Sequence, residues 1–137
     1  LHCFISTIWG QEKDTAYEVV TVAFYNLENL FDTLNDPNTR DDDRTPEGRD
    51  RWTEDIFQKK VKNMAAVLAQ IGAETTHQPP AVIGLCEVEN RQVVEDLIFS
   101  PTLKPFDYGI VHYDSPDERG IDVALIYQKK HFLPFVF

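Results

Sequence analysis

Two polar side chains stand directly after apolar stretches that predict buried strands. Glu87 follows the apolar run Ala81–Cys86, and Asn26 follows Val19–Tyr25, which is rich in β-branched and aromatic residues. An ionised carboxylate beside an apolar strand is costly unless a cation, a hydrogen-bond donor or water compensates its charge. Mg²⁺ takes oxygen ligands and often uses only one or two protein carboxylates. Glu87 therefore fits a sparse metal site, although its position suits a solvent-facing glutamate equally well.

The elements that must position these residues indicate an α/β fold, in which helices cover a sheet. Strands are predicted at Val19–Tyr25, Ala81–Cys86, Tyr108–Tyr113 and Ile121–Tyr127. Between them, an apolar periodicity predicts a helix that begins after Thr53 and ends at Gly72, and Asn90 caps a second helix at Arg91–Phe99. Ligands of such sheets tend to lie beyond the strand ends, so adjacent strands would bring Asn26 and Glu87 together.

The acidic stretch 35–51 has almost no apolar residue and predicts an exposed loop. A calcium loop over Asp36–Glu47 is disfavoured, because Arg40 and Asp41 occupy positions that need a ligand and a glycine. Cys86 has no base nearby in the sequence and predicts a buried structural thiol. The lysines of the first helix predict a solvated face rather than a phosphate patch: Lys59, Lys60 and Lys62.

The length of 137 residues allows one compact domain, and the formal net charge is −10. Surfaces that hold duplex nucleic acid are usually basic, and this sequence lacks that signature overall. Acidity does suit metal binding, because a bound dication reverses the local field where a phosphate docks. Charge alone leaves both a nucleic acid and a small phosphoester as substrate classes.

The first residues predict a targeting segment. Residues 1–10 are mostly apolar and charge follows at once, as in the trailing part of a secretory signal peptide, so residues 11–18 are expected to be a linker. A buried N-terminal strand is the alternative. We expect a secreted or periplasmic protein without stable membrane insertion, since no other apolar run approaches the ~20 residues that cross a bilayer.

Three segments in fixed order carry a family resemblance: FYNLENLFD (Phe24–Asp32), GLCEVEN (Gly84–Asn90) and YDSPDERGIDVALIY (Tyr113–Tyr127). Together they resemble the N-terminal half of endonuclease/exonuclease/phosphatase domains, the deoxyribonuclease I-like superfamily, and are most similar to its secreted bacterial branch. The resemblance implies one half of a four-layer α/β/β/α sandwich. Residues 19–137 would then be a truncated domain that needs its C-terminal half to complete the fold.

The resemblance also implies a divalent-metal-dependent phosphoester hydrolase. Glu87 would be the principal Mg²⁺ or Mn²⁺ ligand, Asn26 would help to hold the metal and the scissile phosphate, and Glu28 would be a second acid near the metal. Arg119 would contact a phosphate, and Asp122 would orient a catalytic histidine. From the residues alone, Arg119 could instead pair with Asp117 in a turn, and Asp122 could close that turn.

Water must be activated by a base to attack phosphorus. In the family that base is a histidine of the C-terminal half, and the Gly-Asp-x-Asn and Ser-Asp-His segments that accompany it do not occur here. His112 and His131 lie outside matching motifs and are expected to be structural. The chain alone is therefore expected to be inactive, and a non-catalytic metal- or phosphate-binding module of the same fold is the alternative. The resemblance implies a phosphoester substrate, with nucleic acid among the candidates.

Overall fold

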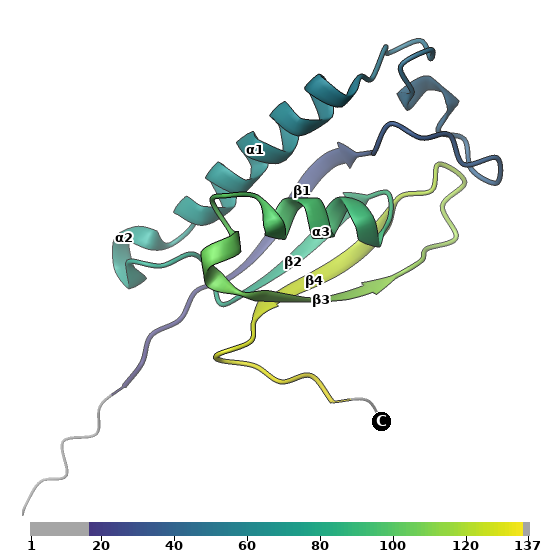
Figure 1. Ribbon diagram of the computed structural model, residues 1–137. Coiled ribbons are helices and arrows are strands. Elements are labelled where there is room, and N and C mark those ends of the chain that lie inside the picture. Colours follow the sequence, from purple (N-terminus) through teal and green to yellow (C-terminus); the bar gives the residue numbers. More distant parts are fainter. Residues whose placement is uncertain (1–16, 136–137) are drawn as a thin grey trace, which may run out of the picture.

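The structure of the protein is a computed structural model that describes residues 17–135. The expected signal-peptide remnant, residues 1–10, lies outside the described residues, as does most of the expected linker, residues 11–18. The described part has a sheet, helices along it, and long loops gathered at one end (Figure 1). None of its helices is long and apolar enough to cross a membrane.

Four strands form one mixed sheet in the order β1-β2-β4-β3. The strands are β1 (Val22–Leu30), β2 (Val82–Val88), β3 (Tyr108–Tyr113) and β4 (Asp122–Gln128). β1 and β2 run parallel, whereas β4 is antiparallel to both β2 and β3. The predicted α/β fold is confirmed, and the central place of β2 accounts for its continuous apolar run.

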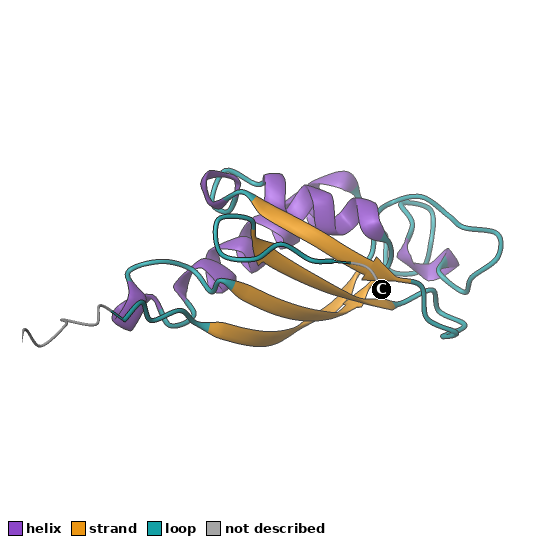
Figure 2. Cartoon of the chain, turned by 90° about the horizontal axis from the view of Figure 1, so that it is seen from below, coloured by secondary structure: helices purple, strands orange, loops and turns teal. Residues whose placement is uncertain are grey.

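The helices cover one face of this sheet, as Figure 2 shows. α1 (Glu54–Gln70) turns one apolar stripe towards the core, formed by Phe57, Val61, Ala65 and Leu68. Gly72 follows with φ 69°, a left-handed conformation that glycine adopts at low cost, and a short helix α2 (Ala73–Thr76) comes next. The predicted helix and its glycine stop are thereby confirmed.

α3 (Arg91–Phe99) has the bounds that the sequence predicts. The side chain of Asn90 caps it, since its Oδ1 accepts a hydrogen bond of 3.0 Å from the backbone N–H of Val93. Two turns of 3-10 helix, η1 (Asp42–Arg44) and η2 (Lys104–Phe106), lie in the loops.

The other face of the sheet carries apolar side chains that no helix of the described part covers. Phe24 is 84% exposed, whereas its neighbour Ala23 is buried on the helix side. The expectation of a buried strand at Val19–Tyr25 is therefore wrong for the open face within residues 17–135, because helices pack on one face alone. Cys86 lines the open face and is only half-buried, so the expected buried thiol is also corrected.

Irregular backbone explains where the strand limits differ from the prediction. β1 runs on to Leu30 and β2 runs on to Val88, so Asn26 and Glu87 lie within the strands rather than after them. The register of β1 on β2 shifts after Asn26, and the register of β2 on β4 shifts around Glu87. The predicted limits lay at the ends of the apolar runs, whereas these strands continue through bulges beyond them.

The acidic loop is less exposed than its composition suggests. The side chain of Asp41 is buried at 1% exposure, and its Oδ2 accepts a hydrogen bond of 2.9 Å from the backbone N–H of Asp36. On α1, Lys59 and Lys62 are solvated as predicted, but Lys60 is half-buried. Composition averages over a loop, whereas burial depends on what the loop packs against.

Candidate functional site

Asn26 and Glu87 lie side by side. Parallel pairing sets Asn26 opposite Cys86, which places it beside the next residue of β2. Asn26 Nδ2 donates a hydrogen bond of 2.9 Å to Glu87 Oε1. Glu87 Oε2 accepts a second, of 3.0 Å, from the backbone N–H of Asn29. The sequence-based expectation that neighbouring strands join these two side chains therefore agrees with their placement.

Strained backbone surrounds the pair. Glu28, Asn29 and Glu87 have φ of 54°, 60° and 60°, the left-handed region that non-glycine residues seldom adopt. In the bulge of β1, Asn26 Oδ1 accepts a hydrogen bond of 2.6 Å from the backbone N–H of Glu28. The amide of Asn26 thus joins both its own bulge and the carboxylate of the next strand.

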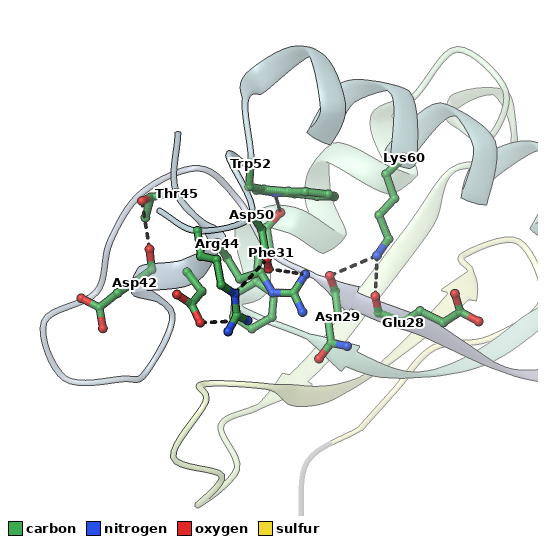
Figure 3. A network of polar contacts seen from close by, with 11 residues as sticks. Glu28, Asn29, Phe31, Asp42, Arg44, Thr45, Asp50, Trp52 and Lys60 are labelled. Atoms are coloured by element: carbon green, nitrogen blue, oxygen red, sulfur yellow. Dashed lines mark hydrogen bonds and ion pairs between the residues drawn. The ribbon is translucent and has the colours of Figure 1, made fainter. Parts of the chain in front are cut away.

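Lys60 of α1 reaches this bulge from the helix side (Figure 3). Its Nζ donates to the backbone carbonyl of Glu28 and, at 3.1 Å, to that of Asn29. The ammonium lies 5.5 Å from the ring centroid of Trp52, whose Nε1 donates to the carbonyl of Phe31 at 3.0 Å. Burial first, and then the charge of Arg44, lowers the pKa of Lys60.

The side chain of Glu28 is not joined to Asn26 and Glu87, as the expected second acidic ligand would be. Its side chain is exposed and, in Figure 3, extends away from Lys60. Within the described part of the chain, that carboxylate has no hydrogen bond or ion pair with Asn26 or Glu87. Its backbone shapes the site, and a metal-binding role of its side chain stays a prediction.

Arg119 is paired within its own turn. Its Nε and Nη2 donate to the two carboxylate oxygens of Asp117 at 3.0 and 2.8 Å. These bonds lower the pKa of Asp117 to about 2 and raise the pKa of Arg119, to which the charge of Glu87 adds a smaller contribution. The charge of Glu87 thus acts on the guanidinium. The pairing of Arg119 with Asp117 is the alternative that the residues alone had left open.

Asp122 opens β4 with a buried side chain, 7% exposed. Its Oδ1 accepts a hydrogen bond of 2.7 Å from the backbone N–H of Ser115, so it closes the turn, as its own alternative reading proposed. Its Oδ2 lies 3.0 Å from His112 Nε2, and His112 Nδ1 lies 3.8 Å from Asp114 Oδ1. Sequence reasoning treated His112 as structural and did not place it beside Asp122.

A second acidic residue of the same strand end escaped sequence reasoning. Burial first, and then the charges of Asp32 and Asp41, raises the pKa of Glu89 to about 8, although a hydrogen bond of 2.6 Å from the backbone N–H of Asp32 lowers it. Asp41 Oδ1 is buried without a hydrogen-bond donor. The sequence signal that could have identified Glu89 is its position between apolar Val88 and Asn90, the cap of α3.

These features gather at one end of the sheet, where the loops after β1 and β3 meet (Figure 1). A contact of 2.7 Å between Arg40 Nη1 and Glu118 Oε2 joins those two loops. The arrangement brings hard oxygen ligands, a strained backbone and an arginine to one edge. Such an edge, just beyond the strands, is where α/β proteins commonly bind ligands.

Comparison with known proteins identifies the family. Residues 21–137 match the family model described as Endonuclease/Exonuclease/phosphatase family. No curated protein and no solved structure matches the chain. The sheet covered by helices on one face is one half of the deoxyribonuclease I-like architecture. The chain belongs to the endonuclease/exonuclease/phosphatase family.

Proposed function

We propose that this protein is a divalent-metal-dependent phosphoester hydrolase whose metal-binding half is built around Asn26 and Glu87. The family to which the chain belongs is generally hydrolytic. The observation that carries the proposal is the contact of 2.9 Å between Asn26 Nδ2 and Glu87 Oε1 across neighbouring strands. It joins a carboxylate and an amide at an accessible edge.

The donor set fits Mg²⁺ or Mn²⁺. Both residues offer hard oxygen atoms, and each oxygen that already accepts a backbone or amide hydrogen retains a second lone pair. Asn26 is exposed and Glu87 is half-exposed, so an ion and a phosphate group can reach them. We propose Glu87 as the principal ligand, Asn26 as its neighbour, and Glu28 as an outer acid.

A divalent cation supplies charge stabilisation on the phosphate oxygens and on the leaving group. The residues of this chain would do the positioning. The Asn26 amide orients the Glu87 carboxylate, and the bulge that Lys60 holds sets the direction of both. Arg119 would leave Asp117 to contact a phosphate, since its side chain is solvated in the turn.

The catalytic base is proposed to come from the C-terminal half of the same domain, in a longer protein. Support comes from the open apolar face of the sheet, on which Phe24 and Val123 are exposed, since a second sheet is the layer that such a face packs against. His131 instead lies beside Glu18: its side chain is 16% exposed, and its Nδ1 is 3.7 Å from Glu18 Oε1. Because the base is proposed to come from the C-terminal half, the 137-residue chain alone is expected to lack activity. We also propose secretion, because of the predicted signal remnant.

A substrate panel tests the proposal. DNA, RNA, phospholipid and nucleotide substrates are assayed with the full-length protein, with and without chelator. We expect hydrolysis of at least one phosphoester class that chelator abolishes and Mg²⁺ or Mn²⁺ restores. Hydrolysis that chelator leaves unchanged contradicts the proposal. Metal binding without any hydrolysis favours the non-catalytic module.

Substitution of Glu87 is the sharper test. Glu87→Gln should lower metal-dependent activity by about a hundredfold or more, because the principal charge that holds the cation is lost. Glu74→Gln is the matched control, since Glu74 is exposed on α2 at the far end of the sheet (Figure 1). Turnover rates are compared over a metal titration. Equal turnover in the two variants, with an unchanged metal response, rejects the assignment of Glu87.

A further inference from the structure

His112, Asp114 and Asp122 form a cluster apart from the Asn26 and Glu87 pair. One ligand atom from each of the three lies within 4.8 Å of the others. Antiparallel pairing sets His112 of β3 opposite Ala124 of β4, so Asp122 is its diagonal neighbour on the same face. That is the helix-covered face, to which buried Ala124 also belongs, whereas Asn26 lines the open face.

The buried imidazole nitrogen at the centre of this cluster has no hydrogen-bond partner. The side chain of His112 is 8% exposed, and its Nε2 is buried without a hydrogen bond, although Asp122 Oδ2 lies only 3.0 Å away. The two atoms are thus in contact without a hydrogen bond between them. Native structures rarely leave such a nitrogen unsatisfied.

Two ligands of one metal ion also lie close together without a hydrogen bond between them. Nitrogen and oxygen atoms bound about 2.1 Å from a common ion lie about 3.0 Å apart at a right angle and about 3.4 Å apart at the tetrahedral angle, and the ion occupies the axis of the nitrogen lone pair. Asp122 is held for such a role, because its Oδ1 accepts from the backbone N–H of Ser115 and leaves Oδ2 facing His112. Partners of this kind orient a metal-binding carboxylate.

Asp114 supplies the adjustable third ligand. Its side chain is 95% exposed at the end of β3 and borders a cleft that Asp122 also lines. An exposed aspartate can change rotamer at low cost, so the spread of up to 4.8 Å between the three atoms can close around an ion. The cleft gives the ion a route from solvent.

We propose that His112, Asp114 and Asp122 form a second divalent-cation site, which ties the turn 114–121 to the ends of β3 and β4. A mixed nitrogen and oxygen set suits Zn²⁺ or Mn²⁺ better than the all-oxygen cations Mg²⁺ and Ca²⁺. This gives Asp122 a role different from orienting a catalytic histidine. The turn carries Arg119, so the site also fixes the base of the turn that presents that side chain.

Zinc binding in the full-length protein tests this site by isothermal titration calorimetry in a Glu87→Gln background, which removes the principal ligand of the other site. We expect one Zn²⁺ ion per chain. His112→Gln and Asp114→Asn should each weaken binding by at least about tenfold. Asp114 is exposed, so its substitution leaves the fold intact. Asp107→Asn, which removes an exposed aspartate paired with Lys129, is the control and should bind as the background does.

An independent readout is the nuclear magnetic resonance signal of the His112 ring, which should shift on Zn²⁺ addition in the Glu87→Gln background. The proposal is overturned if His112→Gln and Asp114→Asn bind Zn²⁺ as tightly as the background does. It is also overturned if Glu87→Gln alone removes all zinc binding. Neither outcome depends on hydrolytic activity, so the site can fail while the proposed hydrolase stands.

Discussion

The amide of Asn26 is shared between two elements. Its Nδ2 donates to Glu87 across the strands, and its Oδ1 accepts from the backbone of Glu28 in its own bulge. A side chain that uses both ends of its amide has one orientation, and this fixes the direction of the Glu87 carboxylate. Such preorganisation is the main contribution that a protein makes to a sparse metal site.

Replacing this amide tests its role. Asn26→Ala in the full-length protein should lower metal-dependent activity about tenfold or more, because Glu87 then retains only the Asn29 N–H as a directing partner. Asn63→Ala on the exposed side of α1 is the control. Steady-state kinetics over a Mg²⁺ titration would show the loss, and an unchanged metal requirement would count against the amide.

Glu89 makes stability depend on pH. Its folded-state pKa of about 8 lies above the ordinary 4.5, so the contribution of Glu89 to folding stability is fully present below pH 4.5 and declines as the pH rises towards 8. Glu89→Gln mimics the protonated form and can still accept from Asp32. We expect the variant to flatten this decline and to be the more stable protein at pH 8. Urea unfolding at several pH values, with chelator present, measures it, and parallel curves for both proteins would contradict it.

At the scale of elements, α1 holds the bulge of β1. The helix packs its apolar stripe on the sheet, and Lys60 extends from it to the carbonyls of Glu28 and Asn29 beside Trp52 (Figure 3). Carbonyls in a left-handed bulge lack regular strand partners, so a charged donor from a neighbouring helix stabilises a conformation that is otherwise costly.

Loss of this contact should affect both stability and activity. Lys60→Met keeps the apolar stem but removes the donor, and should lower the free energy of unfolding by about 2 kcal/mol. Activity should fall as well, since the bulge sets the position of Asn26. Lys59→Met changes the exposed neighbour and is the control. Denaturant unfolding and kcat are compared, and identical behaviour of the two variants would remove Lys60 as a positioning residue.

At the scale of the whole molecule, the sheet has one covered and one open face (Figure 2). The open face bears Phe24, Val123 and Leu125 around half-buried Cys86. A contiguous apolar surface of this kind is typical of an interface. The proposed C-terminal half would remove it from water.

Cys86 reports on that covering. In a Cys3→Ser background, the thiol of the 137-residue chain should react with a maleimide at least about tenfold faster than the same thiol in the full-length protein, because a packed second sheet shields it. Mass spectrometry of the labelled peptide gives both rates. Equal rates would mean that the open face stays open in the longer protein.

Local signals were sufficient for much of the fold. α3 has its predicted bounds because its Asn90 cap is encoded directly before it, and β3 likewise matches Tyr108–Tyr113. The meeting of Asn26 and Glu87 was also predictable, because parallel neighbours in an α/β sheet end at the same edge. Three ordered motifs indicated the family, which the match over residues 21–137 confirms.

Only the tertiary structure decided the rest. The bulges around Asn26 and Glu87 arise from strand register, which no single segment encodes. The contact of Lys60 with the β1 bulge depends on how α1 docks, and the pairing of His112 with Asp122 depends on a diagonal between two strands. A sequence specifies which side chains face one way along an element. Which of them meet is set when the elements pack, because only packing brings distant residues within hydrogen-bond reach.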